Sequence, residues 1–173
     1  MKTGTAGPQG AGVKRALERI YRRHRQGLFT LALTVTRSPA AAEDAVQEAF
    51  ARLWRLKKRP AGDPVAYVFA AVRNAATDQL RRRREPPADA AASIFNGSVT
   101  SPEAAALEAE RQRLLAEAVE ALPEAQREAI VLRVYADLSF AQMAEALGEP
   151  LPTVAGRYRR GLERLRETMA RTL

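Results

Sequence analysis

The sequence predicts an all-α protein made of two small helical domains joined by a flexible linker. Ala, Leu, Glu and Arg, which favour helices, dominate the composition. Apolar residues recur at steps of three and four over most of the chain. Residues 85–101 instead contain two adjacent prolines, small residues and no such period. They are therefore predicted to link a domain at residues 13–84 to a second domain at residues 102–173.

The net charge of +8 is unevenly distributed along the 173 residues. Residues 1–84 hold 18 Lys and Arg against 6 Asp and Glu, a balance of +12. Residues 85–173 hold 10 against 14, a balance of −4, although residues 151–173 again have an excess of Arg. Two separate basic regions favour two contacts with a polyanion such as nucleic acid.

Several classes of chemistry are excluded by composition. The chain has no cysteine, which excludes a disulfide framework and thiolate chemistry. His24 is the only histidine, so no metal site, no cofactor and no catalytic role is predicted, and we expect a protein that is not an enzyme. There is no apolar run of roughly 18–20 residues and no signal-peptide core, so we expect a cytoplasmic protein without membrane insertion.

The first domain is predicted to begin with a long helix. Residues 1–12 are rich in Gly, Thr and Ala and are expected to form a disordered tail. A helix is predicted from about Val13, with His24 as a surface side chain. Residues 28–35 (LFTLALTV) alternate in part like a strand, but their apolar spacing of three and four favours a helix. Its apolar face comprises Leu17, Ile20, Tyr21, Leu28, Leu31, Ala32 and Val35.

Ser38 followed by Pro39 predicts the capped start of a second helix that runs to about Leu56. Its apolar stripe comprises Ala45, Val46, Ala49, Phe50, Leu53 and Trp54. Near its N-terminal end lies a compact acidic and amide patch: Glu43, Asp44, Gln47 and Glu48. Complementarity to the helix dipole, about 0.3–1 kcal/mol per charge, accounts for the first two residues better than for the whole patch.

Residues 57–63 are predicted to form a loop, and Asp63 followed by Pro64 predicts a third helix to about Arg84. The apolar face comprises Val65, Val68, Phe69, Val72, Ala76 and Leu80. A different face carries Tyr67, Asn74, Asp78, Arg81 and Arg82. An aromatic ring beside amide and guanidinium groups can stack on unpaired bases and bond to them, which is typical of single-stranded nucleic-acid binding.

The second domain is predicted to end in a helix-turn-helix. Ser101 and Pro102 predict an acidic helix to about Leu122, and Pro123 opens the next, whose core residues are Ile130, Val131, Val134 and Tyr135. A short helix follows from Phe140 to Leu147. Ser139 and Gln142 fit a capping box at its start, Gly148 fits a turn with positive φ, and the last helix opens near Pro152.

The last helix has a basic outer face. Its inward stripe comprises Val154, Tyr158, Leu162, Leu165 and Met169. Arg157, Arg160 and Arg164 lie on another face, where guanidinium groups could bond to guanine edges or neutralise phosphates in a major groove. A solvated basic face on an ordinary helical hairpin is the alternative interpretation.

Three stretches together resemble the bacterial RNA polymerase sigma factors of the small, two-domain extracytoplasmic-function (ECF) group of the sigma-70 family. They are AAEDAVQEAFARLW (residues 41–54), AYVFAAVRNAATDQLRRR (66–83) and LPEAQREAIVLRVYADLSFAQMAEALGEPLPTVAGRYRRGLERLR (122–166). Their joint occurrence, in this order around the linker, is far more specific than the helix-turn-helix alone. The resemblance covers most of residues 28–166.

The resemblance implies three contact surfaces. The first stretch would dock on the β′ coiled coil of core RNA polymerase through Glu43, Asp44, Gln47, Glu48 and Arg52. The second would recognise and help to melt the −10 promoter element through Tyr67, Arg73, Asn74, Asp78, Arg81 and Arg82. The third would read the −35 element in promoter DNA through Thr153, Arg157, Tyr158, Arg160 and Arg164, Tyr158 being also partly core. The β flap of the polymerase and an anti-sigma protein are further implied partners.

Three features of the sequence depart from the family pattern. Ala155 and Gly156 replace a basic residue and a serine, and the glycine costs about 1 kcal/mol of helix stability relative to alanine. The loop at residues 57–63 is shorter than the usual base-capturing loop. Tyr67 stands where the family usually has a tryptophan, and its ring offers less area for stacking.

Two other functions compete with the sigma-factor interpretation. A stand-alone helix-turn-helix regulator would bind duplex DNA without polymerase, normally as a dimer. No dimerisation heptad is evident, and the polar face of the third helix would then have no role. A nucleic-acid enzyme is disfavoured because the sequence has no carboxylate cluster suited to two-metal catalysis.

Overall fold

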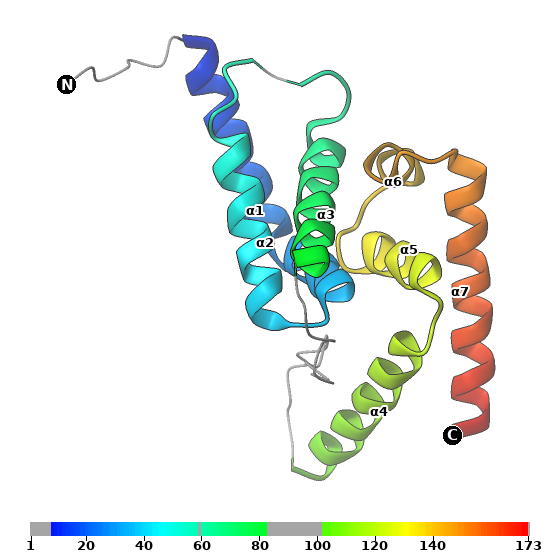
Figure 1. The fold of residues 1–173 in the computed structure, drawn as a ribbon. Coiled ribbons are helices and arrows are strands. Elements are labelled where there is room, and N and C mark those ends of the chain that lie inside the picture. The colour runs from blue at the N-terminus through cyan, green and yellow to red at the C-terminus, as the bar shows by residue number, and fades with distance from the viewer. Residues whose placement is uncertain (1–7, 59, 83–101, 173) are drawn as a thin grey trace.

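The computed structural model describes residues 8–58, 60–82 and 102–172, and every regular element within these ranges is an α-helix. The helices, in chain order, are α1 (Pro8–Thr36), α2 (Pro39–Leu53), α3 (Pro64–Arg82), α4 (Pro102–Glu120), α5 (Glu124–Val134), α6 (Phe140–Leu147) and α7 (Leu151–Thr172). Figure 1 shows α1, α2 and α3 as one bundle, with α5, α6 and α7 forming a second bundle beside it. The prediction of an all-α fold is confirmed.

The first bundle is closed by local caps and a dense apolar core. Ser38 caps α2, since its Oγ accepts a hydrogen bond from the amide of Ala41 at 3.4 Å. Asp63 caps α3, because its Oδ1 accepts from the amides of Val65 at 2.7 Å and Ala66 at 3.1 Å. The core is built from the predicted stripes, and the Phe69 side chain at its centre is completely buried.

The second bundle contains the predicted helix-turn-helix. The capping box at α6 is present, since the Ser139 and Gln142 side chains each bond to the other residue's backbone amide. Gly148 ends α6 in the left-handed region, with φ of 67°, which a glycine adopts without steric cost. Met143 of α6 and Val154 of α7 are both fully buried, so these two helices cross over a shared core.

Some boundaries and exposures differ from the expectations. α1 begins at Pro8 rather than near Val13, because a proline fits the first helical position, so residues 8–12 of the expected tail are helical and residues 1–7 lie outside the described ranges. α2 ends at Leu53, and Trp54 is its C-cap. Tyr21, Trp54 and Val134 were expected to face inward, but they are 44%, 39% and 56% exposed.

These exposures have local causes. The Tyr21 ring lies edge-on to Phe50 at the rim of the first bundle. The ammonium group of Lys14 lies 5.7 Å from the centre of the Trp54 ring, which makes a cation–π contact at the surface. Val134 is the last residue of α5, and its side chain is exposed between the buried residues Leu132 and Ala136.

The two domains are docked against each other, which the sequence did not reveal. One continuous cluster of buried apolar residues includes Leu28 and Phe69 of the first domain together with Leu132, Leu138 and Met143 of the second. In Figure 1, α5 and α6 lie between α3 and α7. α7 is therefore separated from α3 by α5 and α6.

Candidate polymerase and nucleic-acid interfaces

The acidic and amide patch of α2 is accessible on the surface of the first domain. Glu43, Asp44 and Gln47 are exposed, and Glu48 is half-buried. Arg52 lies one turn after Glu48 and forms an ion pair with it. The patch is a cluster of hydrogen-bond acceptors with one cation at its edge, which suits a basic protein surface.

The same patch is joined to α3. Glu48 Oε2 accepts a hydrogen bond from Gln79 Nε2 at 3.2 Å and lies 3.6 Å from Arg82 Nη1. α2 and α3 thus present their polar faces on neighbouring surfaces of one rigid bundle. A contact at the α2 patch and a contact at the end of α3 are therefore fixed in their relative positions.

Most of the predicted nucleic-acid face of α3 is accessible. Tyr67 is 38% exposed, and Asn74, Arg81 and Arg82 are exposed, while Asp78 is half-buried. Arg73 is different because its guanidinium group is already paired. Its Nε and Nη2 donate to Glu128 of α5 at 2.9 and 3.1 Å, and this hydrogen bonding raises the pKa of Arg73.

Tyr67 also borders a small apolar cavity. The cavity has a volume of about 20 Å³ and is lined by apolar residues of α1, α2, the 57–63 loop and the start of α3, including Leu17, Leu56 and Pro60. A volume of this size holds no more than a water-sized group. The structure therefore offers the exposed ring of Tyr67 as a surface on which a base can stack.

On α7 the predicted DNA-binding residues fall into two groups. Thr153, Arg160 and Arg164 are exposed. Arg157 is part-buried and donates from Nη1 to Glu149 Oε1 at 2.7 Å, so part of its charge is balanced.

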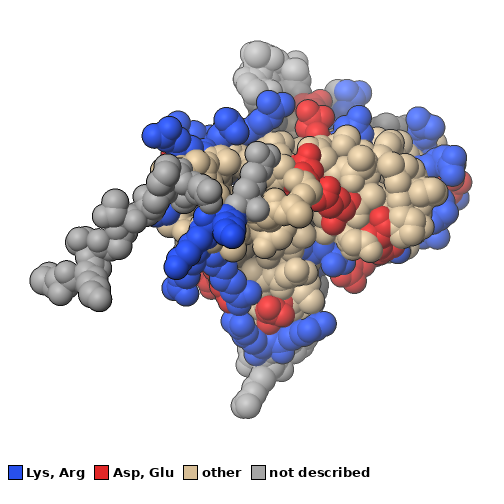
Figure 2. All heavy atoms as spheres, turned by 90° about the horizontal axis from the view of Figure 1, so that it is seen from above, with Lys and Arg blue, Asp and Glu red and all other residues tan. Residues whose placement is uncertain are grey.

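Figure 2 shows Lys and Arg side chains at the edges of the molecule, with Asp and Glu lying mainly in a band nearer the middle of this face.

Tyr158 belongs mainly to the core. It is half-buried, and its ring meets that of Phe140 of α6 edge-on, with the centroids 5.5 Å apart.

Gly156, two residues earlier on α7, is buried under the side chain of Arg160. A β-carbon at position 156 would lie 3.4 Å from Arg160 Nη1. This glycine therefore does not present open backbone to a ligand in this conformation.

The sequence did not predict the contacts between the domains that are made by three polar residues: Glu128, Gln142 and Glu145. The Glu128 side chain is 3% exposed. Its position offered a signal, because it precedes the buried residues Val131 and Leu132 by three and four positions and so occupies the apolar side of α5. A carboxylate at such a position needs a partner, which the structure provides in Arg73.

His24 was predicted to be a surface side chain, and the structure corrects this. The ring is part-buried, its Nδ1 lies 3.1 Å from the carbonyl oxygen of Ala136, and it meets Phe69 edge-on.

Within the described ranges, no cluster of three or more His, Asp or Glu side chains could hold a metal ion. None of the helices in those ranges is long and apolar enough to cross a membrane.

Comparison with known proteins identifies both domains. Residues 20–85 match the family model of Sigma-70 region 2, and residues 112–165 match that of Sigma-70 region 4. The ECF RNA polymerase sigma factor RpoE of Cereibacter sphaeroides is 33% identical over 137 residues, covering 75% of this chain and 72% of the relative.

Solved structures share the fold across nearly the whole chain. CnrH, solved in complex with the cytosolic domain of CnrY, is 25% identical with a TM-score of 0.62, covering 95% of this chain and 94% of CnrH. The sigma factor RpoE of Bartonella quintana, solved with the anti-sigma factor NepR, is 21% identical with a TM-score of 0.68, covering 91% and 96%. The architecture is thus that of a two-domain sigma factor. The chain belongs to the extracytoplasmic-function group of the sigma-70 family.

Proposed function

We propose that this sigma factor binds core RNA polymerase through the α2 patch and directs transcription initiation at promoters with −10 and −35 elements. The observation that carries the proposal is the placement of the α2 patch and the exposed part of the α3 face on one bundle. α7, which carries the arginines of the second domain, lies on the far side of α5 and α6 from that bundle (Figure 1). This arrangement suits a chain that holds polymerase and two DNA elements at once.

In this proposal the α7 face docks in the major groove at the −35 element and fixes the position of the promoter. The α3 face then captures unstacked bases of the −10 strand, with Tyr67 as the stacking platform. Unstacking costs a few kcal/mol per base, and stacking on an aromatic side chain returns about 1–3 kcal/mol. The protein makes and breaks no bond itself, because the polymerase carries out the chemistry.

The partners follow from the same surfaces. The α2 patch would meet the β′ coiled coil, and the second domain would contact the β flap. An anti-sigma protein is a further proposed partner, because the RpoE of Bartonella quintana was solved with the anti-sigma factor NepR. Cytoplasmic localisation is part of this proposal, since the polymerase and the promoter are found there.

The test is co-elution of the purified protein with bacterial core polymerase that lacks its own sigma factor, at moderate salt. We expect the wild-type chain to co-elute stoichiometrically and the Asp44→Arg, Gln47→Arg double variant to elute separately. Both side chains are exposed, so the fold is expected to stay intact.

The matched control is the Glu108→Arg, Gln112→Arg double variant on α4. It makes the same change in charge at another acid–amide pair, whose side chains are hydrogen-bonded at 3.3 Å, and it lies outside the α2 patch, the α3 face and the α7 face. We expect it to co-elute like the wild type. Failure of the wild-type chain to bind, while a competent sigma factor does, would overturn the proposal.

A further inference from the structure

We propose that α1 carries a further DNA-binding surface, which holds the phosphate backbone of duplex DNA without reading its sequence. We call this surface the α1 ridge, and it consists of five exposed arginines: Arg15, Arg19, Arg22, Arg23 and Arg25. The proposed function assigns surfaces on α2, α3 and α7 and leaves these arginines without a role. Binding of duplex DNA by the ridge therefore goes beyond that function and does not depend on it.

The ridge follows from the helical spacing of the arginines. Arg15, Arg19 and Arg22 follow one another at steps of four and three residues, so they lie along one line of the helix. Arg23 and Arg25 flank this line on its two sides. From Arg15 to Arg25 the ridge extends about 15 Å along the helix axis, at 1.5 Å per residue. One strand of a duplex presents about four phosphates over that length.

The other sides of α1 are covered by the rest of the protein. On one side, the Tyr21 ring lies edge-on to Phe50 of α2. On another, Gly27 lies so close to the turn after α5 that a β-carbon there would be 2.7 Å from Ala136 Cα. Leu17, between these two sides, is buried in the core. The ridge occupies the side of α1 that faces away from these contacts.

The ridge arginines are not compensated by acidic side chains. Within the described ranges, no carboxylate forms an ion pair with any of them, and Glu18, the one acidic residue of α1, forms none either. Arg113 of α4, by comparison, is paired with both Glu110 and Glu117. α1 holds six Lys and Arg against one Glu, a balance of +5, and α7 holds six against two, a balance of +4. α1 is therefore at least as basic as the helix proposed to bind DNA.

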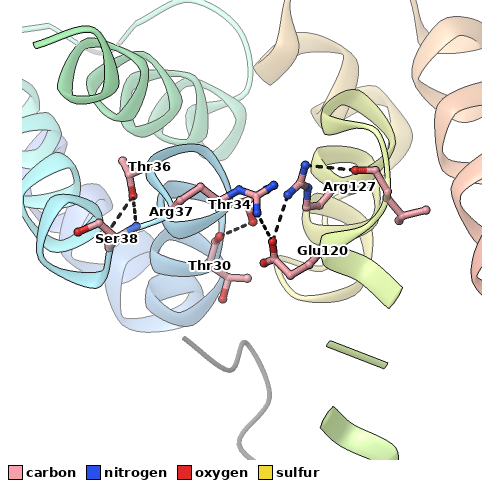
Figure 3. A network of polar contacts seen from close by, with 8 residues as sticks. Thr30, Thr34, Thr36, Arg37, Ser38, Glu120 and Arg127 are labelled. Atoms are coloured by element: carbon pink, nitrogen blue, oxygen red, sulfur yellow. Dashed lines mark hydrogen bonds and ion pairs between the residues drawn. The ribbon is translucent and has the colours of Figure 1, made fainter. Parts of the chain in front are cut away.

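The contrast with a structural arginine is clear directly after α1. Arg37 forms an ion pair with Glu120 of α4, and Glu120 also accepts from the buried Arg127 at 3.2 Å (Figure 3). Arg127 Nη2 donates to the carbonyl oxygen of Leu122 at 3.2 Å. The guanidinium groups in this network are held by partners of the protein itself. Those of the ridge are exposed, so a ligand can reach them.

The stability of the helix does not account for the ridge. Cations stabilise a helix when they lie in its last turn, but the last turn of α1 holds no basic residue, and the ridge lies near the middle of Pro8–Thr36. Like charges three or four residues apart on a helix repel one another. The ridge therefore opposes folding in the free chain, and a bound polyanion relieves the repulsion.

Duplex DNA fits the ridge better than other anionic partners do. Single strands are held by aromatic rings placed among cations, whereas the polar positions beside the ridge arginines are Glu18 and Gln26. A helix on a membrane surface needs an apolar side in the lipid, and the apolar side of α1 is buried. Protein interfaces centre on apolar or aromatic anchors. A row of guanidinium groups instead suits duplex phosphates, whose contacts carry no sequence information.

The ridge lies on the half of α1 that is next to Tyr67. Val13, Leu17 and Ile20 of α1 line the small cavity that Tyr67 also borders, so this half of the helix packs beside the start of α3. A duplex on the ridge is thus held close to the ring on which, in the proposed function, a base of the opened strand stacks. This consequence rests on the proposed function, unlike the binding itself.

The experiment measures the affinity of the full chain for a labelled random duplex by anisotropy, between about 50 and 200 mM salt. Arg19→Ala with Arg22→Ala removes two cations from the ridge. Each phosphate contact contributes about 0.9 to the slope of log affinity against log salt, so the slope should fall by about 1.8. Over this fourfold change in salt, the wild type should lose about 12-fold more affinity than the variant.

The matched control is Arg111→Ala with Arg171→Ala, on α4 and in the last turn of α7. Both arginines are exposed, and neither has an ion pair within the described ranges, so the variant removes the same free charge from other places. We expect it to keep the wild-type slope. An equal fall in the two variants would assign the effect to net charge and overturn the proposal.

A conservative variant tests whether charge alone is used. Arg19→Lys with Arg22→Lys keeps both charges but not the planar guanidinium fork, so phosphate contact should keep the wild-type slope. If the slope instead falls as far as it does with alanine, the two arginines do not act as simple phosphate contacts, and the proposal is wrong.

The ridge is separated from α7 by combining variants. In a chain that already carries Arg160→Ala and Arg164→Ala, the alanine pair in the ridge should lower the slope by a further 1.8, about the same amount as alone. No further fall would mean that duplex DNA binds through α7 only. A labelled single strand of the same length is the second probe. A larger loss of affinity for the single strand than for the duplex would assign the ridge to single strands and overturn the choice of partner.

Urea denaturation at low salt excludes a structural role for the ridge. Because the two substitutions relieve repulsion, the alanine variant should unfold at the same urea concentration as the wild type or at a higher one. Unfolding at a clearly lower concentration would show that the arginines support the fold, and it would overturn the proposal. Failed co-elution with polymerase would instead count against the proposed function and leave the salt slopes standing.

Discussion

Gly161 of α7 lies against Ile130 of α5 so closely that a β-carbon at position 161 would be 3.1 Å from Ile130 Cγ1. This distance is tighter than ordinary van der Waals contact, so the glycine allows the last helix to pack closely on α5. Gly156, earlier on the same helix, would meet only the flexible end of Arg160, at 3.4 Å. Two glycines of one helix therefore have different structural roles.

We expect Gly156→Ala to raise the free energy of unfolding by about 0.5–1 kcal/mol, because alanine loses less backbone entropy in a helix. Gly161→Ala gains the same helix propensity, but overpacking against Ile130 costs about 1–3 kcal/mol. It should therefore be less stable than the Gly156→Ala variant. Urea denaturation of both variants and the wild type measures the difference. Equal stabilisation by the two substitutions would show that the helix packing has room at both positions.

Tyr158 is expected to act through packing rather than through its hydroxyl group. Because its ring meets Phe140 edge-on, Tyr158→Phe should keep both the stability and the duplex affinity of the wild type. Tyr158→Ala removes the ring and should lower the free energy of unfolding by about 2–4 kcal/mol. Urea denaturation and anisotropy with labelled duplex DNA measure the two effects. A marked loss of duplex affinity in Tyr158→Phe would instead assign the hydroxyl group to DNA contact.

The features that could be predicted from sequence are those in which neighbouring residues determine the geometry. Ser38, Asp63 and Ser139 each cap the helix that directly follows, and Gly148 ends α6 with the positive φ expected of it. Such features depend on spacings of a few residues, which a single sequence displays. The helix-turn-helix and the candidate surfaces on α2, α3 and α7 could be predicted from the sequence for the same reason.

The docking of the two domains could not be predicted in this way. Arg73 and Glu128 read as two ordinary charged residues, and their pairing depends on how two domains meet in space. Gly27 and Ala136 give no periodic signal, because small residues are compatible with either exposure or close packing. The family resemblance assigned Arg73 to recognition of the −10 element, whereas the structure places it in an ion pair.

The arginines of α7 should contribute unequally to DNA affinity. Each phosphate contact contributes about 0.9 to the slope of log affinity against log salt, so Arg160→Ala with Arg164→Ala should lower the slope by about 2. Arg157→Ala should lower it less than Arg160→Ala, because Arg157 already shares its charge with Glu149. Random duplex DNA serves as the probe, titrated at several salt concentrations.

The control for this titration is Arg111→Ala with Arg113→Ala on α4, which removes the same charge from another helix. We expect this pair to leave the slope nearly unchanged. If both double variants lower the slope equally, the net charge of the chain rather than the α7 face governs the binding.

Tyr135 should make the protein sensitive to alkaline pH. Burial raises the pKa of Tyr135 from its ordinary value of 10 to about 12, because the charged phenolate is poorly solvated in the folded protein. The unfolded chain therefore loses this proton at lower pH than the folded one. The stability that comes from the neutral phenol is complete below pH 10 and is lost as the pH rises toward 12.

Tyr135→Phe carries no proton to lose, so its free energy of unfolding should fall less than that of the wild type between pH 9 and pH 11, bracketing the ordinary pKa of 10. Urea denaturation at both pH values gives this difference directly. Tyr21→Phe, which removes an exposed phenol, is the control and should follow the wild type. If the wild type and Tyr135→Phe lose stability in parallel, other groups cause the alkaline sensitivity, and the burial of Tyr135 has no energetic consequence in this range.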